Sequence, residues 1–364
     1  MMVLVIRPLA ANETQKTVAD QESSQISTGK QILPLPIIGY APETKLILGG
    51  MVLGQFKMPG TTEKDRSSNA LVFGNFSFFK HYMFGIEQTL FTGREKWMWT
   101  GNLAIARFPD KFWGIGPSTR DDEEVKMDYL VIGLTQNLYR RMGQQLFIGP
   151  RLRWEKQYSV RFTDQDDQRV YFDDLNATGD YHILGLGAGL IWDRRNRVLM
   201  PTSGFYLGMN GFVHHKNLGS SYSYTLFQID ARTYFTFGEA DQQVLAMQFI
   251  TRQAMGDVPF RDLPLLGGMH ILRGYYGGRY RDKHYSAFQS EWRQKVWGPL
   301  GVTFFAGAGN VADKPSHFFD TTLKYAAGFG LRYNINEQDP VNVRVDCSFG
   351  PGTSGVYITL AEAF

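Results

Sequence analysis

The residues that could do chemistry are few and scattered along the chain. The sequence contains no Gly-x-Ser-x-Gly elbow, no His-Glu-x-x-His pair and no phosphate-binding P-loop. Adjacent His214 and His215 would point to opposite faces of a strand and cannot share one metal, so we expect both to be surface residues near a loop. A barrel phospholipase needs a Ser, a His and a polar third group that converge on the lipid-facing wall, and no such trio can be placed. The sequence therefore predicts no catalytic residue, no metal and no cofactor, and we expect that the protein is not an enzyme.

Composition excludes several other classes of protein. The chain has 364 residues, of which 43% are hydrophobic and 14% aromatic, and its formal net charge is only +3. The Lys and Arg residues are scattered, which predicts no nucleic-acid partner. No stretch approaches the roughly 18 apolar residues that a membrane-spanning helix needs. Cys347 is the single cysteine, so no disulfide can form within the chain.

Apolar and polar residues alternate with a period of two from about residue 44 to the C-terminus, which predicts β-strands. In residues 341–349, for example, the apolar face opposes Asn342, Arg344, Asp346 and Ser348. Many of the strands are about ten residues long or longer and carry charges at mid-strand, as a tilted transmembrane barrel with a polar lumen requires. The sequence therefore predicts an all-β fold, a transmembrane antiparallel β-barrel of about sixteen strands in the bacterial outer membrane, with membrane lipid as its neighbour.

Loop lengths alternate as they do in such a barrel. Short turns are predicted near residues 140–143, 238–242, 297–300 and 336–340, and long connections near residues 109–126, 161–179 and 257–283. Short periplasmic turns and long extracellular loops are typical of outer-membrane barrels. We expect the barrel to occupy residues 32–364. Residues 1–31 would form a flexible periplasmic tail that starts with either the remnant of a signal peptide or a disordered segment.

Three stretches carry a resemblance to a known family. Leu272-Arg273-Gly274-Tyr275, preceded by Leu265-Leu266-Gly267-Gly268, is similar to the Val-Arg-Gly-Phe/Tyr signature in the sixth extracellular loop of the outer-membrane protein assembly-factor superfamily. These are the BamA/TamA-like bacterial surface antigen barrels. Residues 285–364 resemble the C-terminal strands of the family. A turn motif also resembles a periplasmic turn of these barrels, and its marker residues are Asp193, Arg195, Pro201 and Gly204.

The resemblance implies sixteen strands and a long sixth loop that folds back into the lumen. It also implies that Arg273, followed by Gly274 and Tyr275, pairs there with Glu291, an arrangement that we call the lumen latch. From the residues alone, a solvated Arg273 and a pair between Glu291 and Lys295 are the alternatives. Asp193 is expected to fix a turn rather than to act in catalysis.

This sequence departs from the family pattern in two places. Relatives carry a lumen-facing Asp on the strand after Glu291, but Gly307 stands there, so we expect Arg273 to have one carboxylate partner. Members that insert other proteins carry soluble periplasmic POTRA modules before the barrel, and the sequence leaves no room for one. The second departure bears on the assembly activity and leaves the expected fold untouched.

The first and last strands are expected to meet in a weak lateral seam. The first strand, at Leu35–Ala41, is crowded by Pro34, Pro36 and Pro42, none of which can donate to a ladder. The last strand is expected at Gly355–Phe364, with Glu362 near the membrane interface. We expect the seam to be formed by Gly39 and Tyr40 on one side and by an outward stripe on the other, made of Val356, Ile358, Leu360 and Phe364.

The resemblance implies a barrel that templates insertion or transport of a substrate through this seam, with a periplasmic or lipoprotein partner as one option. A passive channel, a structural scaffold of an envelope complex and a lipid-acting barrel enzyme are the alternatives. Conductance across a planar bilayer would identify the first, and co-purification from native membranes the second. Hydrolysis of dispersed phospholipid would identify the third. The sequence names neither the substrate nor the oligomeric state.

Overall fold

A computed structural model describes residues 31–61, 65–172, 175–238, 242–335 and 341–364 of the chain. The predicted tail lies outside the described residues except for Gln31, which begins the first strand. The turn predicted at 336–340 lies outside them as well. Among the described residues, no helix is long and apolar enough to cross a membrane.

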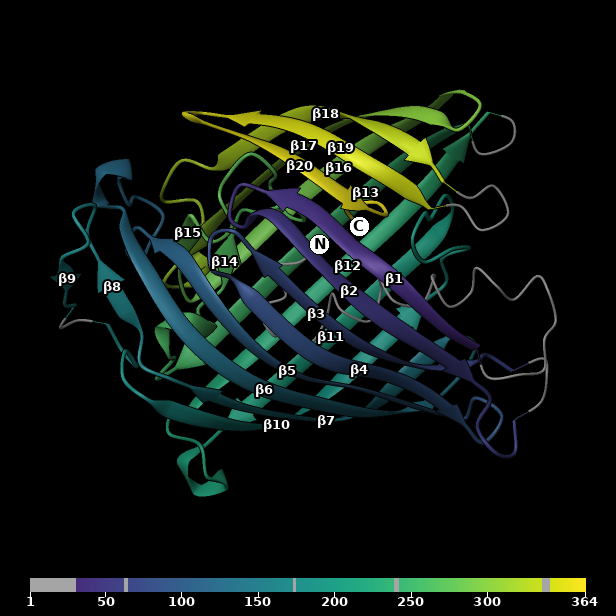
Figure 1. Ribbon diagram of the computed structural model, residues 1–364, viewed down its shortest axis with the longest axis horizontal. Helices are drawn as coiled ribbons and strands as arrows, with labels where there is room; N and C mark the ends of the chain where they lie inside the picture. The colour runs from purple at the N-terminus through teal and green to yellow at the C-terminus, as the bar shows by residue number, and fades with distance from the viewer. Residues whose placement is uncertain (1–30, 62–64, 173–174, 239–241, 336–340) are drawn as a thin grey trace.

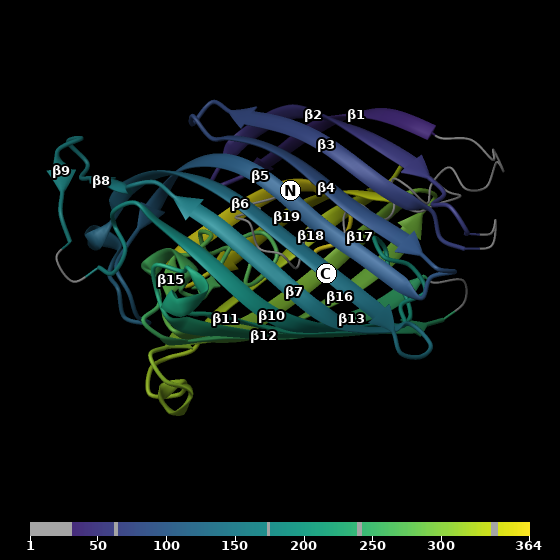
Figure 2. The same ribbon diagram turned by 90° about the horizontal axis from the view of Figure 1, so that it is seen from below.

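Sixteen long antiparallel strands form a closed barrel, which confirms the predicted fold class (Figures 1 and 2). The strands of the first half are β1 (Gln31–Ala41), β2 (Lys45–Phe56), β3 (Ser68–Ser77), β4 (Tyr82–Thr92), β5 (Trp97–Phe112), β6 (Val125–Arg141), β7 (Leu146–Gln157) and β10 (Tyr181–Asp193). Those of the second half are β11 (Gly204–His214), β12 (Tyr224–Phe237), β13 (Gln243–Gly256), β16 (His284–Trp297), β17 (Leu300–Ala312), β18 (Lys324–Asn334), β19 (Asn342–Gly350) and β20 (Thr353–Leu360).

Consecutive barrel strands pair with each other, and β1 meets β20 to close the wall. The first strand is longer than predicted, because pairing with β2 extends back to Gln31 through both prolines. The last strand is shorter than predicted and ends at Leu360. Ala361 takes a positive φ of 65°, which breaks the extended backbone there.

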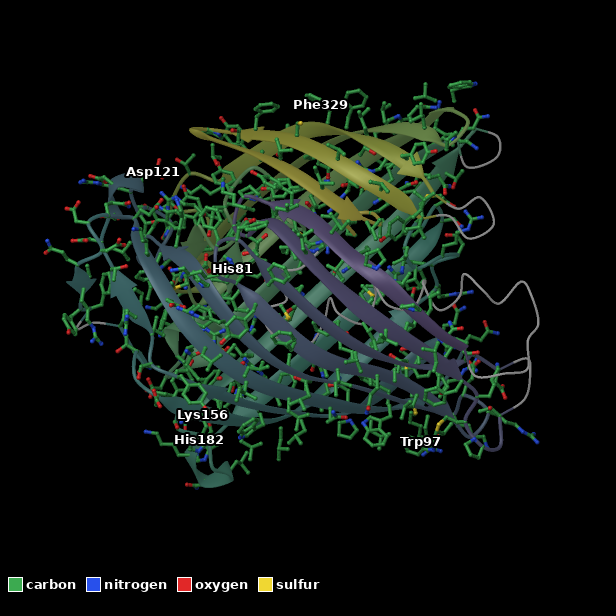
Figure 3. All side chains as sticks on the ribbon, in the orientation of Figure 1. His81, Trp97, Asp121, Lys156, His182 and Phe329 are labelled. Atoms are coloured by element: carbon green, nitrogen blue, oxygen red, sulfur yellow. The ribbon has the colours of Figure 1, made fainter. Side chains whose placement is uncertain are left out.

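Each strand presents one face outward and one face inward, as the period of two requires. On β16–β20 most of the exposed side chains are apolar, and they include Phe288, Phe304, Phe329, Phe349 and Val356. Figure 3 shows the Phe329 side chain pointing outward from the wall. The alternate positions are buried and polar, and they include Glu291, Arg293, Arg332, Arg344 and Asp346. We therefore take the exposed apolar side as the lipid face and the polar side as the lumen face.

The long connections after β5, β7 and β13 gather at one end of the barrel, the loop end, and the short turns after β4, β6 and β16 lie at the other, the turn end (Figure 1). Figure 3 shows Asp121 at the loop end and Trp97 toward the turn end. Small elements occur in the loops: η1 (Asp121–Glu123), β8 (Arg161–Thr163), β9 (Arg169–Val170), η2 (Lys216–Leu218), η3 (Phe260–Asp262), β14 (Leu265–Leu266), β15 (Tyr280–Arg281) and η4 (Pro315–His317). An aromatic cluster packs the end of β5 and two of the loops together, and its members are Phe112, Phe162, Phe172 and Phe260.

Candidate functional site: the sixth loop and the seam

The sixth loop, residues 257–283, has a backbone that glycine makes possible. Gly267 has a φ of 107°, and a Cβ there would lie 2.3 Å from the Tyr276 carbonyl oxygen. Gly274 has a φ of 108°, and a Cβ there would lie 3.0 Å from the Ser348 hydroxyl. Only glycine adopts these conformations without strain, so the two glycines let the loop turn sharply against the wall on both sides of Arg273.

The Arg273 side chain is fully buried and contacts two carboxylates on the lumen face. Its Nη2 donates to Glu291 Oε1 on β16, and its Nη1 donates to Asp346 Oδ2 on β19 at 2.6 Å. Its guanidinium also lies 3.5 Å from the centre of the Phe305 ring on β17. The next two residues are held as well, because the Gly274 N–H donates to a tyrosine hydroxyl and Tyr275 is buried against an apolar cluster. The structure thus brings Arg273 and Glu291 together and adds a second acid.

The prediction that Arg273 has a single carboxylate partner is wrong. The second carboxylate comes from β19 rather than from the position of Gly307 on β17. Gly330 on the intervening strand leaves room for it, because a Cβ at Gly330 would lie 2.1 Å from Asp346 Oδ1. Lys295, the alternative partner of Glu291, is exposed, and Glu291 Oε2 accepts instead from Arg293 Nε at 2.9 Å.

These side chains belong to a larger group that we call the lumen charge cluster. Arg332 Nη1 donates to Asp346 Oδ1 at 2.6 Å, and Arg332 Nε donates to Glu362 Oε2 at 2.8 Å. Glu362 was expected at the membrane interface, but its side chain is buried because the chain turns inward after β20. The cluster contains four guanidinium groups and three carboxylates: Arg273, Arg293, Arg332, Arg344, Glu291, Asp346 and Glu362.

The C-terminal residues 361–364 lie inside the barrel and not on its lipid face. Phe364 is only 5% exposed and packs with Tyr234 and Ala246 on the lumen side of β12 and β13. Its carbonyl oxygen accepts from Arg293 Nη2 at 3.1 Å, and the Ala363 carbonyl oxygen lies 3.2 Å from His270 Nδ1 in the sixth loop. The expectation that Phe364 joins the outward stripe is therefore wrong, whereas Val356, Ile358 and Leu360 do point outward.

The turn motif after β10 is held by internal hydrogen bonds and reaches the lumen charge cluster. Arg195 donates from Nε and Nη2 to the two Asp193 carboxylate oxygens at 2.9 and 2.8 Å. Gly204 has a φ of 95°, and a Cβ there would lie 2.1 Å from the Arg194 carbonyl oxygen. The Pro201 carbonyl oxygen accepts from Arg293 Nη1 at 3.2 Å. Asp193 therefore holds a turn, and Pro201 ties that turn to β16.

A second anchor of the sixth loop escaped sequence reasoning. Asp262 accepts from both terminal nitrogens of Arg153 on β7, each at 2.8 Å. Arg261 Nη1 donates to Glu155 Oε1 at 3.0 Å and contacts Gln157. Burial raises the pKa of Asp262, but the Arg153 guanidinium outweighs burial and holds this pKa well below its usual range. The alternation of Arg151, Arg153, Glu155 and Gln157 along one face of β7 was visible in the sequence, but no pattern there pointed to η3.

His214 and His215 point to opposite faces, as predicted, but only His215 is exposed. The His214 ring is buried and stacks on Tyr224, with ring centres 4.1 Å apart. The Tyr224 hydroxyl donates to Asp262, which brings His214 next to the second anchor. The prediction that His214 is a surface residue is wrong, because its ring lies on the lumen face and is buried against Tyr224. No metal-binding group of His, Cys, Asp or Glu occurs among the residues that the structure describes.

The seam between β1 and β20 has much less backbone pairing than any other junction of the barrel. Among the described residues, Tyr40 and Ile358 are the only aligned pair of this junction, whereas β19 and β20 align eight pairs from Val343–Leu360 to Gly350–Thr353. Continued along the wall, the register of Tyr40 and Ile358 would place Glu362 opposite Pro36 and Phe364 opposite Pro34. Neither proline can donate a hydrogen bond, so this part of β1 offers the C-terminal residues little to pair with. The C-terminal residues leave the wall at this place.

Comparison with known families gives a match over most of the barrel. The model of the Omp85 superfamily domain matches residues 66–343. The chain belongs to the Omp85 superfamily. This Omp85 barrel is similar in structure to BamA from Haemophilus ducreyi lacking POTRA domains 1-3, with a TM-score of 0.63 and 14% identity over 92% of this chain and 70% of that chain. No curated protein sequence matches the chain.

Two further solved structures have the same barrel. CdiB from Acinetobacter baumannii has a TM-score of 0.60 and 12% identity, over 92% of this chain and 60% of that chain. CdiB from Escherichia coli has a TM-score of 0.59 and 10% identity, over 94% of this chain and 69% of that chain. At these identities the likeness shows the fold, and this chain spans between 60% and 70% of the length of these three relatives. The family and the apolar outer face of this Omp85 barrel place it in the bacterial outer membrane, as predicted.

Proposed function

We propose that this barrel opens at the β1–β20 seam and uses the exposed strand edges to template insertion or transport of a substrate polypeptide. The single aligned pair, Tyr40 with Ile358, is the observation that carries the proposal. In lipid, every unpaired backbone group costs several kcal/mol, so a barrel that stays shut has no reason to leave one junction nearly unbonded. An edge that lacks its partner is a template for an incoming strand.

The sixth loop supports this proposal as the element that keeps the rest of the wall in place. Arg273 connects the loop to β16 and β19 through Glu291 and Asp346, and this lumen latch joins β16 to β19, the strand that pairs with β20. The second anchor fixes the start of the same loop to β7. The proposed role is therefore mechanical and not enzymatic. A periplasmic or lipoprotein partner would deliver the substrate.

Crosslinking the seam tests the proposal. Tyr40→Cys and Ile358→Cys are introduced together in a Cys347→Ser background, and the protein is reconstituted into phosphatidylcholine vesicles. The probe is a urea-unfolded eight-stranded barrel polypeptide, whose folding into the vesicles is followed by its shift in gel migration. We expect the reduced protein to speed folding, and the oxidised protein to leave it at the rate of empty vesicles.

The control is a disulfide at an ordinary junction. Leu331 and Val345 are aligned between β18 and β19, so Leu331→Cys with Val345→Cys places the crosslink on the same lipid face. This variant should keep full activity when oxidised. If the oxidised seam variant is as active as the reduced one, lateral opening is wrong, and a passive channel or a structural scaffold becomes the better account.

A further inference from the structure

The β1 side of the seam contacts the sixth loop through the turn between β1 and β2. Glu43 lies in this turn and is only 6% exposed. Its Oε1 accepts from the Gly277 N–H at 2.5 Å, and its Oε2 has no partner among the described residues. This buried carboxylate accepts from a loop N–H and so holds the turn against one point of the loop. The tip of β1 therefore depends on Gly277 for its position.

The β20 side of the seam contacts the same short segment of the loop. The Tyr357 hydroxyl accepts from the Gly274 N–H at 3.0 Å, and Thr353 Oγ1 donates to the Gly274 carbonyl oxygen at 2.6 Å. On the neighbouring strand, Ser348 Oγ donates to the Arg273 carbonyl oxygen at 2.5 Å. The backbone of two consecutive loop residues is thus bonded to β19 and β20.

An apolar contact joins the two sides directly. Met269 of the sixth loop is buried together with Ala41 at the end of β1 and Tyr357 on β20. Ala41 and Tyr357 are each 0% exposed, so the methionine fills the space between the two strands on the lumen side. Loop residues 269–277 therefore touch both edges of a junction that has almost no backbone ladder of its own.

We propose that residues 269–277 act as a seam staple, which holds β1 against β20 from the lumen, and that Glu43 is the positioning residue on the β1 side. The inference rests on the proposed function, because it names what controls opening of the same seam. Contacts between side chains and a loop can be released without unfolding a strand. Opening then requires that the contacts between the staple and the turn between β1 and β2 break, while the backbone ladders on either side of the seam stay intact.

Distances between spin labels across the seam test the staple in the absence of any substrate. Ile38→Cys and Val356→Cys, both outward facing, carry the labels in a Cys347→Ser background, and the whole protein is held in lipid nanodiscs. Glu43→Ala removes the acceptor for Gly277, and Glu43→Gln keeps it. Loss of a hydrogen bond to a charged group changes an equilibrium by roughly tenfold or more, so we expect Glu43→Ala to raise the fraction of long distances about tenfold. Glu43→Gln should match the wild type.

Two further variants keep the result interpretable. Met269→Ala removes the apolar contact with Ala41 on the β1 side and should also raise the fraction of long distances, even if Glu43→Ala does not fold. Asp121→Asn weakens a different attachment of the sixth loop, the pair with Arg279 at 2.7 Å, and should leave the distances unchanged. The staple is refuted if Glu43→Ala and Met269→Ala give wild-type distances, or if Asp121→Asn opens the seam equally.

The two proposals fail separately. Wild-type distances in the staple variants, together with loss of activity in the oxidised seam variant, would reject the staple and keep lateral opening. Full activity of the oxidised seam variant would reject lateral opening. Long distances in Glu43→Ala would then still show that the sixth loop holds the seam.

Discussion

The lumen charge cluster should tolerate loss of an arginine better than loss of a carboxylate. It contains four guanidinium groups and three carboxylates, so it carries one excess positive charge. Glu291→Gln leaves four guanidinium groups with two carboxylates, whereas Arg273→Met leaves three guanidinium groups with three carboxylates. Removing one partner of a buried pair costs about 3–5 kcal/mol, and we expect Glu291→Gln to lower the free energy of unfolding by that amount.

Arg273→Met should cost less, about 1–3 kcal/mol, because both of its acids keep a partner. Glu291 remains paired with Arg293 at 2.9 Å, and Asp346 remains paired with Arg332 at 2.6 Å. The double variant Arg273→Met with Glu291→Gln has three guanidinium groups against two carboxylates, which restores the original excess of one charge. We therefore expect the double variant to be more stable than Glu291→Gln alone.

Urea titration in detergent micelles, followed by tryptophan fluorescence, measures these differences. Asp167→Asn is a matched control in the loops, where Asp167 pairs at 2.7 Å with Lys126 and both side chains are exposed. An exposed pair contributes little to stability, so this variant should be close to the wild type. The reasoning is wrong if Arg273→Met is the most destabilising change, or if the two single effects simply add in the double variant.

Three further outcomes are expected. The folded protein should migrate differently from the boiled protein on a denaturing gel, and recovery of a soluble monomer without detergent would contradict the barrel. Pro34→Ala with Pro36→Ala should restore backbone N–H donors opposite residues 361–364, so we expect a higher unfolding midpoint and slower substrate folding. An unchanged midpoint would show that the prolines do not cause the weak pairing at the seam. Burial raises the pKa of Glu43 to about 7, and the negative charge of Asp110 raises it further, whereas the N–H groups of Glu43 and Gly277 lower it. The folded state therefore binds this proton more tightly than the unfolded state does. Stability should therefore fall by up to about 3 kcal/mol as the pH rises from about 4.5 through 7, and Glu43→Gln should remove this fall in urea titrations at several pH values.

The barrel could be predicted from the sequence because its signals are local. The period of two and the alternation of short turns with long loops are properties of neighbouring residues. The second acid at Arg273 could not be found in this way. Asp346 lies on β19, three strands away from Glu291 on β16, and the space that it occupies depends on Gly330 between them. Contacts between non-neighbouring strands follow from the curvature of the wall, which no spacing in the chain records.

The C-terminus shows a different limit of pattern reasoning. Val356, Ile358 and Leu360 predict that the stripe continues to Phe364, because an apolar residue at an alternating position suits a lipid face. The same residue also suits an apolar cluster in the lumen, and hydrophobicity alone does not distinguish the two. The positive φ of Ala361 decides between them, and a φ above zero at an alanine is uncommon. His214 illustrates the same point. The alternation predicts correctly that it points to the face opposite His215, but it does not predict that His214 is buried there.

The attachments of the sixth loop are unequal, and this inequality gives seam opening a direction. Toward β7 and β19 the loop is held by buried ion pairs, with Asp262 on Arg153 and Arg273 on Asp346. Toward the turn between β1 and β2, the Gly277 N–H donates to Glu43, and no ion pair joins the loop to this turn among the described residues. The β1–β2 ladder is unbroken over the whole of β1, so the two strands would move together. If the seam opens as proposed, the weakest attachment is released first, so the β1–β2 hairpin would move away while the loop and β20 stay with the rest of the wall. A passive channel would instead require the ion-paired loop to leave its anchors, which costs several kcal/mol for each buried charge left unpaired.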